Sequence, residues 1–211
     1  FNYKFLYSLS SNNKKNIQDE SSLFIDKGLD VKFIQGENEN LKITFDSDIK
    51  QNKISYGIGF DVHRLVQNKK LFLGGIKIRS KLGTLGHSDG DPVLHAIIDS
   101  ILGACKMGDI GEKFSNKSRK YKNIRSTILL KKIINKIKLK NFLINNIDIN
   151  IITEKPKISK LKKRLIHSIA KICDISKSQI NIKGKTTEKL GLIGKEKAIA
   201  CEVITSVINY V

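Results

Sequence analysis

An acidic residue and a histidine stand two positions apart in the apolar segment YGIGFDVHRL, residues 56–65. Alternate side chains of a strand share one face, so Asp61 and His63 point the same way if this segment is a strand. His95 lies in the first turn of a helix predicted to begin at Pro92, where it could meet both of them. Two imidazoles and one carboxylate are typical ligands of catalytic zinc, which keeps a fourth position open. Taken alone, such a pair is more often hydrogen-bonded without metal.

The segment LGHSDGDPVLH, residues 85–95, adds polar groups around the predicted start of that helix. Asp91 is predicted to be the N-cap and Pro92 the first helical residue, a position that tolerates proline well. Since a helix N-terminus attracts anions, metal ligands beside it suit a phosphate substrate.

A third polar cluster is KGKTTEKLGLIGK, residues 183–195. Its lysines and hydroxyl groups could hold phosphoryl oxygens, and Glu188 could carry a hard cation such as magnesium. The spacing does not match G-x-x-x-x-G-K-[ST], which excludes a Walker loop. By itself the cluster fits a lysine-rich turn about as well as a site.

The elements that must position these groups are a mixture of strands and helices. Strands are predicted at residues 56–65, 70–78, 145–154 and 180–185, and helices at residues 92–106, 118–140 and 157–174. Periodicity leaves open whether residues 198–211 form a strand or a helix. This order indicates an α/β or α+β fold in which a sheet packs on helices.

The first 54 residues have a different character from the rest of the chain. They are polar and low in complexity, with a possible short hairpin over residues 29–45, and the chain begins at Phe1 rather than at methionine. We expect residues 1–54 to be a weakly ordered N-terminal extension, the remnant of a leader, and residues 55–211 to form one domain.

The formal charge of +19 lies entirely in residues 55–211, because residues 1–54 hold eight lysines and eight acidic residues. Basic faces can bind nucleic acid, but aromatic interleaving and zinc-finger spacing are absent here, so a compositional lysine bias is the better interpretation. No apolar stretch approaches the roughly 20 residues of a membrane span. We therefore expect neither a nucleic-acid partner nor a membrane.

The three cysteines are far apart and show no C-x-x-C spacing, so they indicate neither a disulfide framework nor a thiolate zinc site.

In this order, the segments resemble the 2-C-methyl-D-erythritol 2,4-cyclodiphosphate synthase family of the non-mevalonate isoprenoid pathway. The resemblance covers about residues 56–211 and is carried by GFDVHR, LGGIKI, HSDGDPVLHAIIDSILGACKMGDIG, KPK, KTTEKLG and AIACEV. It implies that Asp61, His63 and His95 hold one zinc ion. It also implies that Glu188 holds a second divalent ion, Mg²⁺ or Mn²⁺.

The resemblance further implies which residues meet the substrate. His87 and Thr186 would stabilise the transition state, Ser88 and residues 109–111 would hold the methylerythritol portion, and residues 153–159 would help to build the cytidine pocket. The full set of implied substrate-binding residues is Ser88, Asp109, Ile110, Gly111, Thr153, Pro156, Lys157, Lys185, Thr187 and Lys195. The chain departs from the family pattern at residues 115–118 and at Lys185, Leu192 and Lys195.

The implied reaction is intramolecular. The 2-phosphate of 4-diphosphocytidyl-2-C-methyl-D-erythritol 2-phosphate attacks the β-phosphorus, and CMP is expelled. The resemblance implies a homotrimer with active sites at subunit boundaries. A metal-dependent phosphohydrolase and a basic nucleic-acid-binding module are the alternatives. The Lys, Asn and Ile bias and the extension suggest an apicomplexan plastid (apicoplast) protein, and a cytoplasmic location otherwise.

Overall fold

The computed structural model describes residues 3–11, 20–32, 34–36, 53–115, 121 and 123–210. The chain forms two compact units, Phe1–Lys50 and Gln51–Val211. The first unit contains the short helices α1 (Tyr3–Ser11) and α2 (Glu20–Ile25), which the sequence did not predict. Residues 29–32 and 34–36 form no strand, and the rest of the hairpin predicted at residues 29–45 lies outside the described residues.

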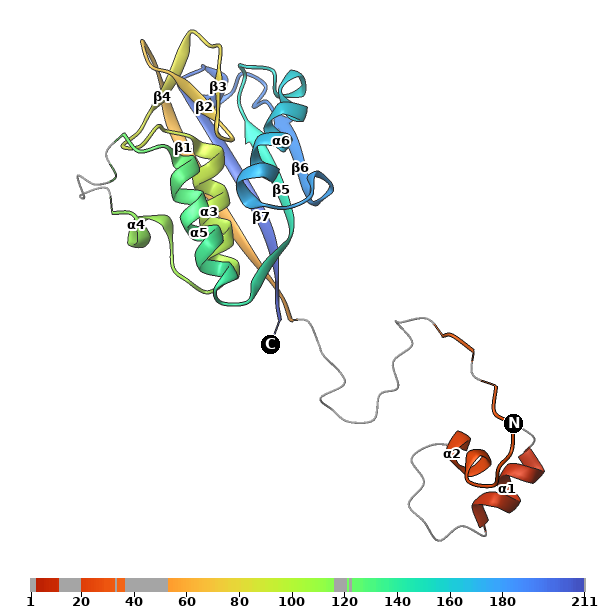
Figure 1. The fold of residues 1–211 in the computed structure, drawn as a ribbon. Coiled ribbons are helices and arrows are strands. Elements are labelled where there is room, and N and C mark those ends of the chain that lie inside the picture. Colours follow the sequence, from red (N-terminus) through yellow and green to blue (C-terminus); the bar gives the residue numbers. More distant parts are fainter. Residues whose placement is uncertain are drawn as a thin grey trace. The chain divides into compact units, whose positions relative to one another are not determined.

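The second unit is built on a five-stranded sheet with the strand order β4-β1-β7-β5-β6 (Figure 1). Its strands are β1 (Lys53–Gln67), β4 (Leu82–Leu85), β5 (Phe142–Ile152), β6 (Ile180–Lys185) and β7 (Ala198–Asn209). Strands β5 and β6 run parallel, and the other pairs are antiparallel. The strands β2 (Leu71–Leu73) and β3 (Ile76–Ile78) form a separate hairpin. Residues 198–209 are therefore a strand, the choice that periodicity left open.

The helices of this unit are α3 (Pro92–Ala104), α4 (Ile110–Lys113), α5 (Ser126–Lys138), α6 (Lys162–Cys173) and α7 (Gly191–Gly194), with 3-10 turns at Ile158–Lys160 and Lys177–Gln179. Helices α3, α5 and α6 cover one face of the sheet (Figure 1). The expected mixed α/β architecture, with a sheet packed on helices, is confirmed.

One predicted helix begins later than expected. The helix predicted at residues 118–140 starts at Ser126, because Arg125 is extended and Asn123 has a φ of 58°. Residues 123–124 instead pair with the loop that precedes α3. The Asn123 N–H donates to the His87 carbonyl, and the Asp89 N–H donates to the Ile124 carbonyl. Pairing with a distant loop overrides the helical periodicity here.

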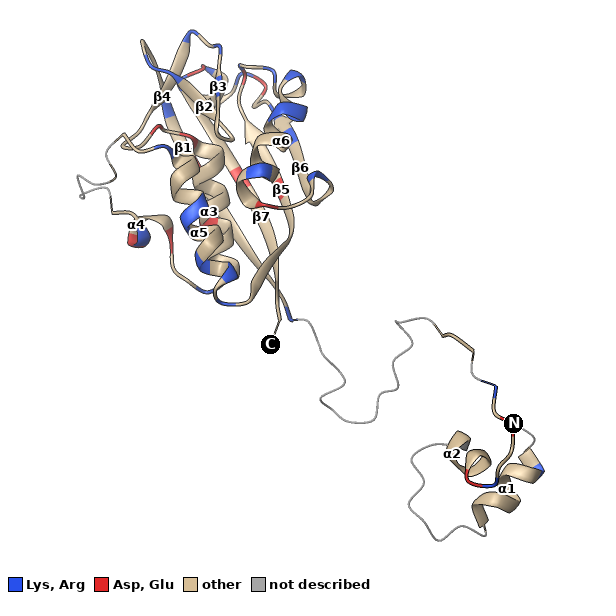
Figure 2. Cartoon of the chain, viewed as in Figure 1, with Lys and Arg blue, Asp and Glu red and all other residues tan. Residues whose placement is uncertain are grey.

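The core lies between the sheet and the helices α3, α5 and α6. Helix α3 is buried almost all round, and the isoleucines of β5 that face it are fully buried. The three cysteines are also buried and unbridged, and burial raises the pKa of the Cys105 thiol to about 11 and of the Cys173 thiol to about 12. Among the described residues, no helix is both long and apolar enough to cross a membrane. Lysine and arginine lie on α5, on α6 and on several turns (Figure 2).

Two glycines let β1 lie directly against α3. A Cβ atom on Gly57 would collide with the Ser100 carbonyl oxygen, and one on Gly59 would collide with the Ala96 carbonyl oxygen. Backbone therefore packs on backbone at this crossing. The next residues on the same face of β1 are Asp61 and His63, which places them over the first turns of α3.

We predict that Gly59→Ala lowers the free energy of unfolding by about 3 kcal/mol, since a well-packed contact has no room for a methyl group. Gly103→Ala is the matched control, because a Cβ there would meet nothing nearer than 3.7 Å. Alanine is also favoured over glycine inside a helix by about 1 kcal/mol, so the control should be neutral or stabilising. Chemical denaturation of both variants measures the difference. Equal stability of the two variants would show that the contact does not constrain the fold.

Candidate metal centre

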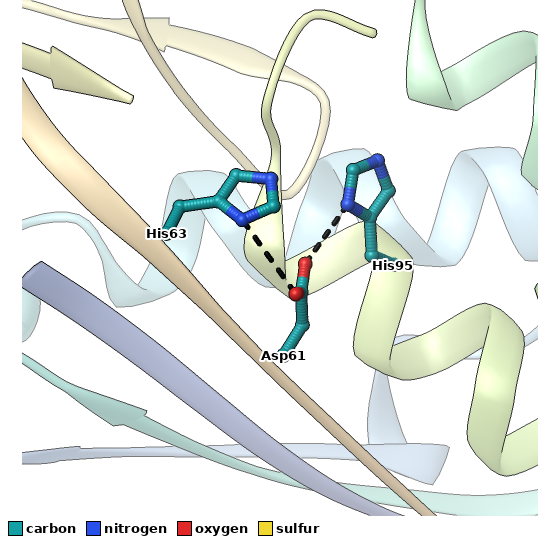
Figure 3. Close-up of side chains that lie close together, drawn as sticks. All are labelled: Asp61, His63 and His95. Atoms are coloured by element: carbon teal, nitrogen blue, oxygen red, sulfur yellow. Dashed lines mark hydrogen bonds and ion pairs between the residues drawn. The ribbon is translucent and has the colours of Figure 1, made fainter. Parts of the chain in front are cut away.

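Asp61, His63 and His95 meet where β1 passes the first turn of α3 (Figure 3). One potential ligand atom from each residue lies within 4.8 Å of the others. Asp61 Oδ2 is 2.9 Å from His95 Nδ1, and Asp61 Oδ1 is 3.6 Å from His63 Nδ1. The structure thus brings together the three residues that strand alternation and the helix start predicted.

Asp91 fixes the start of α3, as predicted for an N-cap. Its fully buried carboxylate accepts hydrogen bonds from the N–H groups of Val93 and Leu94, both at 3.1 Å, and from Gly74 at 3.0 Å and Gly75 at 2.7 Å. Burial raises the pKa of the Asp91 carboxyl, and the donors at Gly75 and Leu94 offset part of that rise. The helix N–H groups of Val93 and Leu94 are therefore occupied by the Asp91 carboxylate and are not free to bind a phosphate.

His63 is held in a narrow position by two glycines. A Cβ on Gly86 would lie 3.1 Å from His63 Nε2, and a Cβ on Gly90 would lie 3.4 Å from His63 Cδ2. His63 Nδ1 is 3.0 Å from the Val62 carbonyl oxygen, which can only accept, so Nδ1 carries the proton of this hydrogen bond. His63 Nε2 is buried and has no hydrogen-bond partner among the described residues. An unprotonated, unpaired nitrogen in that position fits a metal ligand.

His95 is held on both sides of its ring. Nδ1 faces Asp61, and Nε2 lies 2.9 Å from both the Ser88 and the Ser126 hydroxyl oxygens. Burial lowers the pKa of His95, but the nearby carboxylates of Asp61, Asp91 and Asp89 raise it by more than burial lowers it. The pKa of His95 therefore lies above the ordinary value of about 6.5. A carboxylate oxygen and Nδ1 at 2.9 Å need a proton or a cation between them, which is a second observation that fits a metal.

A hollow of about 180 Å³ adjoins the three residues and also contains four of the predicted substrate contacts, namely His87, Ser88, Ile110 and Gly111. Asp109 does not line it but caps α4 by accepting the Glu112 N–H at 2.9 Å. Asp99 also lines the hollow and accepts the Ile110 N–H at 2.7 Å, which ties the turn at residues 109–111 to α3. Burial raises the pKa of the Asp99 carboxyl.

Two residues of the site, Asp99 and Ser126, were not predicted from the sequence. A signal for Asp99 was present, because it lies one helical turn after His95 and so shares its face of α3. No local signal marks Ser126, which lies 31 residues from His95 and reaches it only through the packing of α5 beside α3.

Most of the remaining predicted residues lie at or beside a second hollow, of about 500 Å³, next to β6. Its lining includes Thr153, Pro156, Lys157, Lys185 and Thr186. Thr187 and Glu188 directly follow the lining residue Thr186 in the sequence. The Thr187 N–H donates to Glu154 Oε1 at 3.0 Å, and the Thr186 hydroxyl donates to Glu188 Oε1 at 2.7 Å. Lys195 lines neither hollow and follows α7.

The two hollows belong to different parts of the sheet. Strand β6 is the third strand from β1, and neighbouring strands lie about 4.8 Å apart, so the two strands are separated by about 14 Å. A single chain therefore does not bring Thr186 and Glu188 together with the trio of Asp61, His63 and His95.

Comparison with known proteins places these features in context. The sequence profile of the YgbB family matches residues 54–208. The "Bifunctional enzyme IspD/IspF" of Pelagibacter ubique is 67% identical over 99% of this chain, and the chain spans 57% of that relative's length. The "2-C-methyl-D-erythritol 2,4-cyclodiphosphate synthase" of Clostridium acetobutylicum is 49% identical over 70% of this chain and 96% of its own length.

A solved structure, "IspF (Plasmodium falciparum) CDP complex", is 42% identical to the chain with a TM-score of 0.67. It covers 76% of this chain, and the match spans 99% of its own chain. The two curated relatives are bacterial, so the expected apicoplast location gains no support from them.

Proposed function

Because the chain belongs to the YgbB family, whose profile covers residues 54–208, we propose that it forms 2-C-methyl-D-erythritol 2,4-cyclodiphosphate and releases CMP. The substrate would be 4-diphosphocytidyl-2-C-methyl-D-erythritol 2-phosphate. One observation carries the proposal: Asp61, His63 and His95 are assembled as a potential metal site beside a small hollow. The name of the Clostridium relative, which aligns over 96% of its length, supports the same reaction.

We propose zinc as the ion held by Asp61, His63 and His95. Two imidazoles and one carboxylate suit zinc with one position open, and the unpaired Nε2 of His63 supplies a ready ligand. When bound, zinc neutralises phosphoryl charge and polarises a phosphoryl oxygen as a Lewis acid. It would also replace the proton that the contact between Asp61 and His95 otherwise requires.

The reaction needs no protein nucleophile. An oxygen of the 2-phosphate bonds to the β-phosphorus, the bond from that phosphorus to the bridging oxygen breaks, and the bridging oxygen leaves with CMP. The residues must therefore fold an anionic substrate back on itself and hold attacking and leaving oxygens in line. His87 and Ser88 would orient phosphate oxygens beside the trio, while Ile110, whose N–H is held by Asp99, and Gly111 would close the wall of the hollow.

The hollow beside β6 would hold the cytidine diphosphate portion. Lys157 and Lys185 offer positive charge to phosphates, Thr153 and Pro156 shape the wall, and Thr186 and Glu188 lie at its end. Glu188 would carry the Mg²⁺ or Mn²⁺ ion that the diphosphate shares. The Plasmodium structure, whose title names a complex with CDP, supports a nucleotide partner.

We propose that the chain works as a homotrimer. The face of the sheet that α3, α5 and α6 leave uncovered exposes a row of apolar side chains: Ile54, Tyr56, Ile58, Phe60 and Val62 on β1 and Ile204 on β7. Tyr56 and Ile58 are 69% and 68% exposed. Contiguous apolar surface of this kind is typical of an interface. Packing this face against other copies would let the β6 hollow of one subunit join the metal hollow of the next.

Residues 1–50 lie outside the matched family profile. The match to the bifunctional Pelagibacter relative covers 99% of this chain, although the family profile begins only at residue 54. We infer from this match that residues 1–50 belong to the part of such an enzyme that precedes the synthase domain. The leader interpretation stays a prediction. The bacterial relatives favour the cytoplasmic alternative over the plastid.

The reaction is tested by phosphorus NMR of the product and by zinc analysis. We predict the cyclic diphosphate and CMP from the unsubstituted chain. Asp61→Asn should lose zinc and about a hundredfold in turnover, because removing Lewis-acid stabilisation costs several kcal/mol. Asp174→Asn, an exposed carboxylate paired with Lys138, is the matched control. Inorganic phosphate or a linear diphosphate in place of the cyclic product would indicate a phosphohydrolase instead.

The shared site is tested by mixing inactive chains. In trimers assembled from equal amounts of Asp61→Asn and Thr186→Ala chains, about a quarter of the interfaces should combine two intact halves and regain activity. Asp61→Asn mixed with His63→Ala is the control and should regain none, since both changes lie in the same half. Mixed assemblies without recovered activity, or a monomeric mass, would exclude a site built across subunits.

A further inference from the structure

The side of His95 that faces away from Asp61 makes contacts that the proposed reaction does not explain. His95 Nε2 lies 2.9 Å from the hydroxyl oxygen of Ser126, the first residue of α5. Ser126 is completely buried. The hydroxyl of Ser126 lies in turn 2.5 Å from Asp89 Oδ1. A chain of contacts therefore runs from a candidate metal ligand through a hydroxyl to a carboxylate.

The direction of these hydrogen bonds follows from the number of protons available. A carboxylate only accepts, so the single hydroxyl proton of Ser126 is donated to Asp89. The Ser126 oxygen then has only lone pairs to offer to His95. His95 Nε2 must carry a proton and donate it. With Nε2 protonated, Nδ1, the nitrogen that faces Asp61, is the one left to bind a metal ion in place of a second proton.

Asp89 is well placed to remain an acceptor. Its side chain is 4% exposed and forms an ion pair with Arg125, whose Nε donates to Oδ2 at 2.8 Å. The Ser126 N–H also donates to Oδ1, at 3.2 Å. Arg125 is itself anchored, since its Nη2 donates to the Gly75 carbonyl and its guanidinium group lies 4.2 Å from the centre of the Phe72 ring. The β2–β3 hairpin and the start of α5 thus hold the carboxylate in place.

We propose that Ser126 and Asp89 are positioning residues that hold His95 in the tautomer that binds metal through Nδ1. Neither residue touches substrate or metal in this scheme, and both act through His95. Partners behind a metal-binding histidine commonly fix its tautomer and ring orientation, and their loss weakens metal affinity by about 10- to 100-fold. The inference rests on the proposed metal role of Asp61, His63 and His95.

The position of Ser88 determines how much zinc affinity each substitution should cost. Its hydroxyl oxygen is also 2.9 Å from His95 Nε2, so it can still accept the imidazole proton after Ser126 is truncated. Asp89→Asn is the more severe change, because the new amide can donate to the Ser126 oxygen. The Ser126 proton would then turn toward His95 and favour loss of the proton from Nε2.

The test is zinc affinity of the full chain, measured by competition with a chromophoric chelator. We expect Asp89→Asn to bind zinc about 10- to 100-fold more weakly, with a smaller loss for Ser126→Ala and recovery in Ser126→Thr. Ser100→Ala is the matched control. Ser100 is also fully buried and hydrogen-bonded, to the Ile97 carbonyl and the Thr205 hydroxyl, but it makes no contact with the three ligands. Arg125→Gln removes the ion pair with Asp89 but leaves the Asp89 carboxylate as the acceptor for Ser126, so it separates the two effects.

A spectroscopic measurement separates positioning from a merely structural role. In ¹⁵N NMR spectra of histidine-labelled, zinc-loaded chains, His95 should carry its proton on Nε2 in the Ser100→Ala chain, and the Nε2–H signal should weaken in Asp89→Asn. Zinc affinity and ¹⁵N shifts in Asp89→Asn equal to those of Ser100→Ala would overturn the proposal. If the unsubstituted chain itself bound no zinc, the metal role and this inference with it would fail together.

Discussion

The close contact between β1 and α3 is the constraint on which the site depends. Gly57 and Gly59 carry no side chain, so the strand can lie against the backbone of the helix at Ala96 and Ser100. That contact sets where the following residues of β1 stand above α3, and Asp61 consequently reaches His95 at 2.9 Å. Asp91 completes the arrangement by fixing the first turn of the helix and holding the β2–β3 turn beside it.

Electrostatics then determines what the site can bind. Asp61, Asp89, Asp91 and Asp99 lie around His95, where three of them raise its pKa, so the centre attracts a cation. Two of these carboxylates, Asp61 and Asp99, line the hollow itself, so a bound cation would offset their repulsion of an anionic substrate such as the proposed one. The basic residues Lys157 and Lys185 line the other hollow, beside β6. The division of charge between the two hollows suits the proposed substrate, which carries several phosphates, and the proposed site between two subunits.

The sequence predicted the features that depend on local geometry. It did not predict the features that depend on contacts between segments far apart in the chain. Alternation along β1 and the Asp91-Pro92 helix start were enough to select Asp61, His63 and His95. The start of α5 could not be predicted, because Arg125 leaves the helix to pair with Asp89, which lies 36 residues earlier. Residues 198–209 were ambiguous because β7 is apolar on both sides, and pairing with β1 and β5 makes it a strand. The role of Ser126 depends on tertiary packing alone.

The central claim is that β1 and α3 together build a zinc site from Asp61, His63 and His95. Anomalous diffraction from crystals of the zinc-loaded chain, measured on both sides of the zinc absorption edge, tests it most directly. The account predicts one strong peak in each chain, in contact with all three side chains. Zinc-loaded crystals with no peak at these residues, or with zinc bound only elsewhere, would contradict it.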